Sequence, residues 1–293
     1  MDRRLARLAL ACFACAGAAL TWAAEPAGSA AALSSRYAAL QPELERSPFD
    51  RPLRLDSREA PNEMDGDVHA ILDHPFSLVA GSLQGAPRWC EILLLHLNVK
   101  ACGVVGDAQD NVLRVYIGKK FDEPVREAHK VDFAYRVAAQ GQDYFRMSLT
   151  ARTGPFGTRD YRIIVEAVPL AGGRTFLHLS YAYGYGPAAK MALQSYLRTI
   201  GNQKVGFTVS GTLPDGRPAF VNGLRGALER NVMRYYLAIE AYLAALGAPP
   251  EQRLEERLKD WFDFTERYAL QLHELDQNAY LEMKRRECAL RVD

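Results

Sequence analysis

The sequence predicts an α+β fold in which a curved antiparallel sheet packs around a long C-terminal helix, with an additional C-terminal helical region. Segments of strand composition recur at regular spacing between residues 99 and 185, and turns containing Gly, Asp or Pro separate them. From Val221 to Tyr242, apolar residues repeat every three or four positions, as on the buried face of an amphipathic helix. Pro249-Pro250 ends that helix, and a second apolar stripe follows.

Composition describes a globular chain and excludes two classes of protein. The chain has 293 residues, of which 48% are hydrophobic and 24% charged, and this excludes a disordered protein. Lys+Arg at 36 and Asp+Glu at 35 give a net charge of +1, which excludes a polybasic nucleic-acid binder. The length fits one large domain or two modest ones.

The N-terminus has the features of a secretory signal peptide. Three arginines within the first seven residues precede an apolar run from Leu8 to Trp22, and small residues follow. The run is shorter than the roughly 20 residues that a membrane span needs. We therefore predict a signal peptide over residues 1–24, cut at Ala23 or Ala24, and a periplasmic or secreted mature protein. Cleavage would remove three arginines and one aspartate, so the mature chain would be slightly acidic.

The five cysteines are few and widely spaced. Cys12 and Cys15 lie in the predicted signal peptide, where a lipoprotein site fits poorly because neither cysteine has a leucine three positions before it. In an oxidising compartment, Cys90 and Cys102 could form a disulfide, although two buried thiols remain an alternative. Cys288 would then be unpaired. None of Cys90, Cys102 and Cys288 has a CxxC partner or a nearby histidine at metal spacing, so we predict neither a metal site nor a cofactor.

The region before the main sheet divides into a leader and the start of a domain. Residues 25–52 form a leader segment with one short helix around Ser34–Leu44. Alternating residues between Leu53 and Leu72 predict two strands around a turn. Pro75 and Pro87 then stand just inside two short helical segments, where a missing N–H costs nothing.

Six more strands are expected in the main sheet. Hairpin-sized gaps between them favour an antiparallel meander over βαβ units. They are Val99–Val105, Val112–Lys119, Lys130–Ala139, Asp143–Thr153, Tyr161–Leu170 and Thr175–Tyr185. A helix over Ala188–Ile200, an extended segment at Val205–Val209 and the long helix follow, and a helical extension covers residues 251–290.

This order of elements, with some local motifs, resembles the START-like (SRPBCC) superfamily, whose fold is called helix-grip. The segment Gly66–Phe76, which reads GDVHAILDHPF, and Trp89 are similar to the opening of such domains, and Gly223–Arg230 fits the terminal helix. The resemblance covers residues 53–246. It implies a ligand-binding domain with a cavity between sheet and helix for a lipid, sterol, polyketide or other apolar molecule. Some members of the superfamily are cyclases or hydrolases.

Strand alternation predicts which side chains would line that cavity. Residues two apart on a strand share one face, so the apolar face of each strand should meet the long helix. The predicted lining residues are Phe133, Tyr135, Met147, Tyr161, Tyr181, Tyr183, Leu224 and Leu228. Tyrosine suits such a wall because its ring packs on an apolar ligand while its hydroxyl bonds a polar group. Ordinary cross-strand packing is the alternative interpretation.

The opposite faces of the same strands carry charged residues. Arg136, Arg146, Arg162 and Glu166 are expected to form a charge ladder that faces outward, because they oppose the apolar face. His178 is a candidate general base that would act with Tyr183 or Glu166, but alternation places it opposite Tyr183. A hydrogen-bonded structural histidine is the commoner case.

Charged residues near the C-terminus indicate exposed helix faces. Arg225, Arg230 and Arg234, with Glu229, are interpreted as ion pairs along the long helix. Lys284-Arg285-Arg286 forms a basic patch that could touch anionic lipid head groups or simply end a solvated helix.

From the sequence we predict an exported binding or carrier protein for an apolar small molecule or lipid, without catalysis. Its expected partners are that ligand and, transiently, a membrane surface, but no nucleic acid. One alternative is an enzyme on the same fold that acts on a hydrophobic substrate. The other is an envelope protein that binds a partner through its C-terminal helices.

Overall fold

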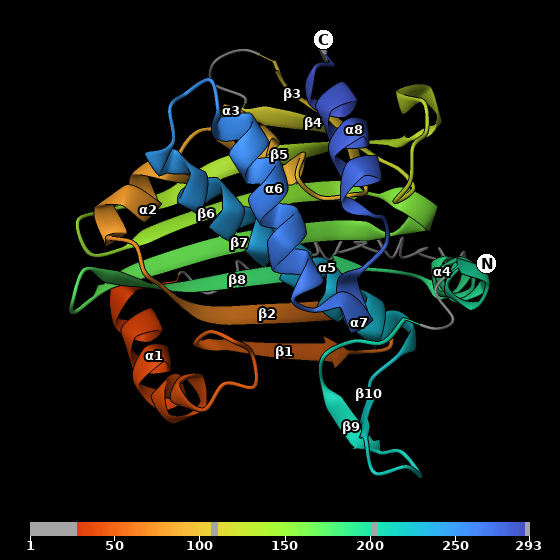
Figure 1. Cartoon of the computed structure of the whole chain (residues 1–293), viewed down its shortest axis with the longest axis horizontal. Coiled ribbons are helices and arrows are strands. Elements are labelled where there is room, and N and C mark those ends of the chain that lie inside the picture. The colour runs from red at the N-terminus through yellow and green to blue at the C-terminus, as the bar shows by residue number, and fades with distance from the viewer. Residues whose placement is uncertain (1–27, 107–110, 201–203, 291–293) are drawn as a thin grey trace, which may run out of the picture.

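The computed structural model describes residues 28–106, 111–200 and 204–290, so the predicted signal peptide lies outside the described residues. Its centre is an antiparallel sheet of eight strands in the order β1-β2-β8-β7-β6-β5-β4-β3, and α5 (Gly223–Ala244) crosses one face (Figure 1). The strands are β1 (Leu53–Glu59), β2 (Glu63–Leu72), β3 (Val99–Val105), β4 (Val112–Ile117), β5 (His129–Gln140), β6 (Phe145–Thr153), β7 (Arg159–Leu170) and β8 (Arg174–Gly184).

The helices surround this sheet on several sides. They are α1 (Ala30–Glu45), α2 (Phe76–Ser82), α3 (Ala86–Leu93), α4 (Pro187–Ile200), α5, α6 (Arg253–Glu266), α7 (Ala269–Leu272) and α8 (Gln277–Cys288). A small hairpin of β9 (Val209–Thr212) and β10 (Pro218–Phe220) precedes α5. Within the described ranges, none of the helices is both long enough and apolar enough to cross a membrane.

Alternation along the strands gives the sheet an inner face and an outer face. In β5, every second residue from Val131 to Tyr135 is buried, while the residues between them are exposed. The inner face packs against α5, and Gly66 of β2 allows close approach, because a Cβ there would lie 3.3 Å from Leu228 of α5. Apolar burial at about 25 cal/mol per Å² holds this contact together.

The predicted leader segment contains α1, which packs on the outer face of the sheet. Leu33, Leu40 and Leu44 of this helix form a small second core with Val168 and Phe176 of β7 and β8. The central strands are therefore covered on both faces. Ser29 caps α1 by accepting a hydrogen bond from the Ala32 N–H.

The C-terminal helices pack onto α5 and β3. Trp261 of α6 stacks on Tyr280 of α8 at 5.0 Å between ring centroids, and its indole N–H donates to the Arg234 carbonyl of α5. Both aromatic side chains belong to the main hydrophobic core. The second apolar stripe is divided between two helices, because α6 ends at Glu266 and α7 begins at Ala269.

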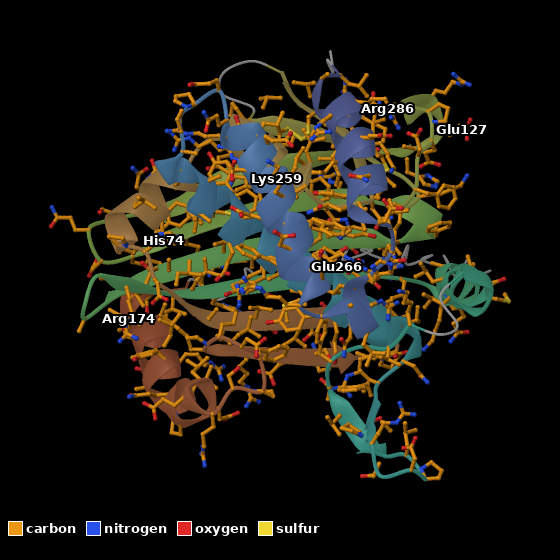
Figure 2. All side chains as sticks on the ribbon, in the orientation of Figure 1. His74, Glu127, Arg174, Lys259, Glu266 and Arg286 are labelled. Carbon is orange, nitrogen blue, oxygen red and sulfur yellow. A yellow bond between two sulfur atoms is a disulfide. The ribbon has the colours of Figure 1, made fainter. Side chains whose placement is uncertain are left out.

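The predicted ion pair between Arg225 and Glu229 of α5 is present, with 3.7 Å between the two side chains, but other charged residues of α5 and α8 are more buried than a solvated helix face would leave them. Glu229, Arg230 and Arg234 of α5 are at most 2% exposed, because α6, α7 and the segment before β9 cover that side of the helix. In the basic patch, Lys284 is fully buried, while Arg286 stays at the surface (Figure 2). The spacing of charged residues along a helix does not tell whether water or another helix covers them.

Lys284 anchors α8 to the sheet through a buried group of ions. Its Nζ donates to the Val99 carbonyl at 2.8 Å and to Glu287 at 2.5 Å, and Lys100 of β3 donates to the same carboxylate at 3.1 Å. One carboxylate thus serves two buried ammonium groups. Removing its charge would leave both cations uncompensated in an apolar region.

We expect Glu287→Gln to lower the free energy of unfolding by about 3 kcal/mol, because breaking a buried ion pair from one side leaves an unpaired charge. Urea denaturation followed by circular dichroism measures this loss. Glu282→Gln on the exposed side of α8 is the matched control. Equal stability of the two variants would contradict the anchoring role.

The predicted disulfide is present and joins α3 to β3. Cys90 and Cys102 have their Cα atoms 5.3 Å apart and close a loop with a sequence separation of 12 residues. Cys288 is a free, half-buried thiol. A disulfide of this kind indicates folding in an oxidising compartment.

The Cys90→Ala/Cys102→Ala double variant should lose roughly 3 kcal/mol of unfolding free energy, because the unfolded chain regains loop entropy. The shift of the urea midpoint measures this, with Cys288→Ala as the control. An unchanged midpoint in the double variant would show that the crosslink contributes no stability.

Candidate functional site

Four tyrosines gather where β7, β8 and α5 meet on the inner side of the sheet. Ring centroids of Tyr161 and Tyr183 lie 5.3 Å apart, and Tyr181 lies 6.1 Å from Tyr161. Tyr235 of α5 completes the group, with its ring 5.5 Å from that of Tyr181. We call Tyr161, Tyr181, Tyr183 and Tyr235 the tyrosine cluster.

The tyrosine cluster keeps a little accessible surface, as do some of its neighbours: Phe133 is 4% exposed and Ala151 is 6% exposed. Tyr161 is 8% exposed and Tyr183 is 9% exposed, whereas Val165 and Leu179, further along the same two strands, are 0% exposed. Tyr235 is half-buried although it faces the sheet. The inner face is therefore fully buried at Val165 and Leu179 and slightly accessible around the tyrosine cluster.

The hydroxyls of this cluster stay protonated at neutral pH. Burial raises the pKa of Tyr161 to about 12, and burial likewise raises the pKa of Tyr181 and Tyr183. The Tyr161 hydroxyl also lies 2.8 Å from the Thr158 hydroxyl. Each ring thus offers an apolar face and a neutral O–H group.

The predicted lining residues all lie in one core, but not around one point. Phe133 packs edge-on against Tyr161 with centroids 6.2 Å apart, whereas the Tyr135 hydroxyl accepts from the Gly85 N–H at 2.7 Å and so points toward α3. The others in the same core are Met147, Leu224 and Leu228, the last packed on Gly66. Their role as ligand contacts stays a prediction.

Sequence reasoning missed Tyr235 as a site residue. It stands in the apolar repeat of the long helix, so the signal was present, but the repeat alone does not separate packing residues from cavity residues. The ring of His96, which follows α3, stacks on Tyr235 at 4.7 Å. Nothing in the spacing of the six histidines predicts that contact.

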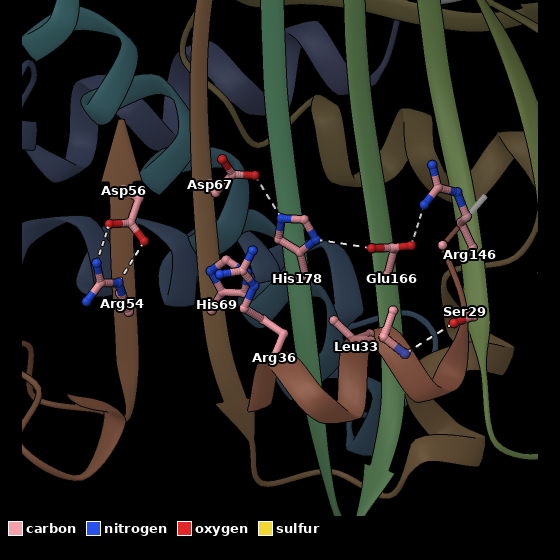
Figure 3. A pocket seen from close by; sticks show the side chains of 12 residues that line it. Ser29, Leu33, Arg36, Arg54, Asp56, Asp67, His69, Arg146, Glu166 and His178 are labelled. Atoms are coloured by element: carbon pink, nitrogen blue, oxygen red, sulfur yellow. Dashed lines mark hydrogen bonds and ion pairs between the residues drawn. The ribbon is translucent and has the colours of Figure 1, made fainter. Parts of the chain in front are cut away.

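A second site is a pocket of about 670 Å³ between α1 and the outer face of the sheet. Arg36 of α1, together with His69, Glu166 and His178 of the strands, lines it (Figure 3). The charge ladder thus faces outward as predicted, and α1 partly covers it. In the part of the chain that the structure describes, no group of His, Cys, Asp and Glu side chains is arranged to hold a metal ion.

His178 lies between two carboxylates in this pocket (Figure 3). Its Nε2 is 2.8 Å from Asp67 Oδ1, and its Nδ1 is 3.2 Å from Glu166 Oε2. Burial alone would lower the pKa of His178, but the hydrogen bonds to Asp67 and Glu166 outweigh it and raise the pKa to about 9. His178 is therefore an imidazolium at neutral pH.

Glu166 is the other half of this ion pair. It accepts hydrogen bonds from Tyr144 and from the Arg146 guanidinium. Burial would raise its pKa, but the bonds to His178 and Tyr144 and the charge of Arg146 lower the pKa to about 2. The neighbouring ring of His69 stacks on His178 at 4.4 Å, and burial, with the charge of His178, lowers the pKa of His69 to about 3.

This arrangement does not form a general base. An imidazolium with both nitrogens donating to carboxylates has no lone pair to accept a proton. Tyr183 lies on the inner face, so the sheet separates it from His178 in the outer pocket. In the structure His178 forms an ion pair with Glu166 and is not near Tyr183.

The stability contributed by His178 should depend on pH. Since its folded pKa of about 9 exceeds the unfolded value near 6.5, this contribution is complete below about pH 6.5 and is lost as pH rises through about 9. We expect the stability difference between wild type and His178→Gln to shrink by roughly 3 kcal/mol between about pH 6.5 and 9.5. Urea titrations at a series of pH values measure it.

The difference, not the wild-type curve, is the correct readout, because Lys120 titrates in the same range. Burial lowers the pKa of Lys120 to about 7, so its effect on stability has the opposite sign and cancels between the two proteins. His129→Gln, at an exposed position, is the control. A difference between wild type and His178→Gln that stays constant across the range would refute the ion pair.

Comparisons with known proteins describe the fold. No protein-family model and no curated protein sequence matches the chain. A solved structure of a conserved protein from Geobacillus kaustophilus is 13% identical, with a TM-score of 0.35, and the match covers 61% of this chain and 95% of that one.

Two further solved structures are similar at the same level. A START superfamily protein from Mycobacterium smegmatis is 12% identical, with a TM-score of 0.31, over 48% of this chain and 95% of its own. The human StAR-related lipid transfer protein 5 is 12% identical, with a TM-score of 0.32, over 59% of this chain and 91% of its own. The order of elements in this chain, an antiparallel sheet crossed by a long helix and followed by further helices, confirms the predicted α+β fold class. The solved structures that match include START-like proteins, the superfamily that the sequence resembles.

Proposed function

We propose that this protein is an exported binding or carrier protein that holds an apolar small molecule or lipid between the inner sheet face and α5, without catalysis. The observation that carries the proposal is the gathering of four tyrosine rings, with some surface still accessible, between the sheet and α5. A buried aromatic group that still has accessible surface is a place where an apolar molecule can lie out of water.

The driving force for binding would be burial of apolar surface. Each Å² of ligand and tyrosine surface removed from water contributes about 25 cal/mol. The neutral hydroxyls of Tyr161 and Tyr183 would orient the ligand by hydrogen bonding. Neither effect requires a bond to be made or broken in the ligand.

Export is supported by two independent features. The N-terminal run from Leu8 to Trp22 has the pattern of a signal peptide. The Cys90–Cys102 disulfide fits an oxidising compartment such as the periplasm.

The alternatives have less support. An enzyme using His178 would need a free base, and this side chain is held as an imidazolium between Asp67 and Glu166. A partner-binding role for the last helices would need a free apolar face, and Trp261 and Tyr280 instead pack in the core of the protein.

Filling the accessible space should prevent binding. Ala151 on the inner face pairs with Tyr161 across β6 and β7, so Ala151→Phe would place a ring beside the tyrosine cluster. We expect at least about tenfold weaker binding of a neutral fluorescent probe such as Nile red, a loss of about 1.4 kcal/mol. Fluorescence titration measures it.

Thr150→Phe is the matched control, because the adjacent residue on the same strand is exposed on the outer face. Native mass spectrometry of the purified wild type gives an independent measure, since a carrier should retain an apolar molecule from the cell. A wild-type protein that neither retains a molecule nor binds the probe would refute the proposed function.

A further inference from the structure

A group of buried basic side chains lies next to the tyrosine cluster. It consists of His96, Lys120, Arg230 and Arg234, which we call the basic cluster. His96, Arg230 and Arg234 are at most 2% exposed, and the Lys120 side chain is 22% exposed. The two arginines come from α5, His96 from the turn before β3, and Lys120 from the connection between β4 and β5.

The described residues supply this cluster with little negative charge. Glu274, after α7, accepts from Lys120 at 2.5 Å and from Arg234 at 2.8 Å. Glu229 is also near Arg230, but its carboxylate already accepts from Ser57 and from Thr208. The Glu274 carboxylate is therefore shared between Lys120 and Arg234.

Several N–H groups of the basic cluster are buried with no acceptor among the described residues. They are Nε and Nη1 of Arg234, Nε of Arg230 and Nε2 of His96. The His96 Nδ1 accepts from the Asn98 N–H at 3.1 Å, so the neutral ring carries its proton on Nε2. Buried donors without acceptors are rare in folded proteins and call for a specific explanation.

The charges of the basic cluster, like its buried N–H groups without acceptors, favour a bound anion. Burial and the charge of Arg234 lower the pKa of Lys120 to about 7 and that of Arg230 to about 10. Burial, followed by the charge of Arg234, also lowers the pKa of His96 well below its ordinary value. These groups repel one another, and an added anion would relieve that repulsion.

The two clusters are in contact. The His96 ring stacks on Tyr235 at 4.7 Å, and Tyr235 directly follows Arg234 on α5. A ligand whose apolar part lies against the tyrosine cluster would therefore place its polar end at the basic cluster. We propose that the basic cluster binds the oxyanion, carboxylate or phosphate, of an anionic amphiphile. This inference rests on the proposed function and narrows its ligand class.

Ligands that share one alkyl chain test the proposal. Isothermal titration of the purified protein would use dodecanoate, dodecyl phosphate and dodecanol, each below its micelle concentration, and inorganic phosphate. We expect at least one of the two anionic ligands to bind about tenfold or more tightly than dodecanol. Inorganic phosphate should bind far more weakly than dodecyl phosphate, because it lacks the apolar part.

Lys120→Met is the main variant, because this side chain reaches the surface and its loss should not prevent folding. It should weaken binding of the anionic ligands about tenfold and leave dodecanol unchanged. Lys119→Met, at the preceding and more exposed position, should change neither. Arg234→Lys, which keeps the charge but loses the orphan guanidinium N–H groups, should also weaken anion binding.

Proton uptake gives a second readout. The groups that act on Lys120 are Arg230 and Arg234 of α5 and the Glu274 carboxylate. Since the pKa of Lys120 is near 7, an anion bound beside it at about pH 8 should draw up to about one proton from the buffer. Titrations in two buffers of different ionisation enthalpy measure this uptake, which should vanish in Lys120→Met.

The outcomes separate the two proposals. Equal affinity for dodecanol and both anions would overturn the anionic site and leave the carrier function standing. Anion binding without proton uptake would overturn the part assigned to Lys120. Inorganic phosphate that binds as tightly as dodecyl phosphate would also overturn the anionic site, because the site would then take a free anion. Binding of no ligand at all would overturn both proposals.

Discussion

The two-residue alternation of β7 and β8 is the constraint on which the rest of this structure depends. It places Tyr181 and Tyr183 on the face that α5 covers, and His178 on the face that α1 covers. A shift of one residue in either strand would exchange these faces and bury His178 and Glu166 against an apolar helix. The apolar and ionic halves of the molecule are therefore separated by the sheet and cannot combine into one reacting group.

Each face then requires its own cover. The outer face carries Phe176 beside the His178 ion pair, so it is neither fully apolar nor fully polar. The helix α1 meets both demands, because its leucines bury Phe176 while Arg36 borders the charged residues. On the inner face, Gly66 pairs with Tyr181 across β2 and β8 and lets α5 approach closely there, and Tyr161 and Tyr183 of the tyrosine cluster keep some accessible surface.

Local pattern predicted the strands, the long helix and the faces of the sheet, because alternation and helical period are properties of neighbouring residues. The strand Val99–Val105 was predictable to the residue, and the outward position of Glu166 followed from its place opposite Ile163 and Val165. The burial of Arg234 and Lys284 was not predictable in this way. Charges spaced along a helix look the same whether water or another helix covers them, and only the packing of α6 to α8 decides the matter.

The C-terminal helices strengthen the electrostatic interactions of the basic cluster. The resemblance to START-like domains ends near residue 246, yet the Leu272 carbonyl and Glu274, which bind Arg234, lie beyond it. By covering α5, the C-terminal region removes the arginines from water, where their attraction to an anion would be screened. In a medium of lower polarity the same charges act more strongly, and without an anion they repel one another more strongly as well. The additional helices therefore do more than cap the domain: they complete the polar end of the proposed binding site.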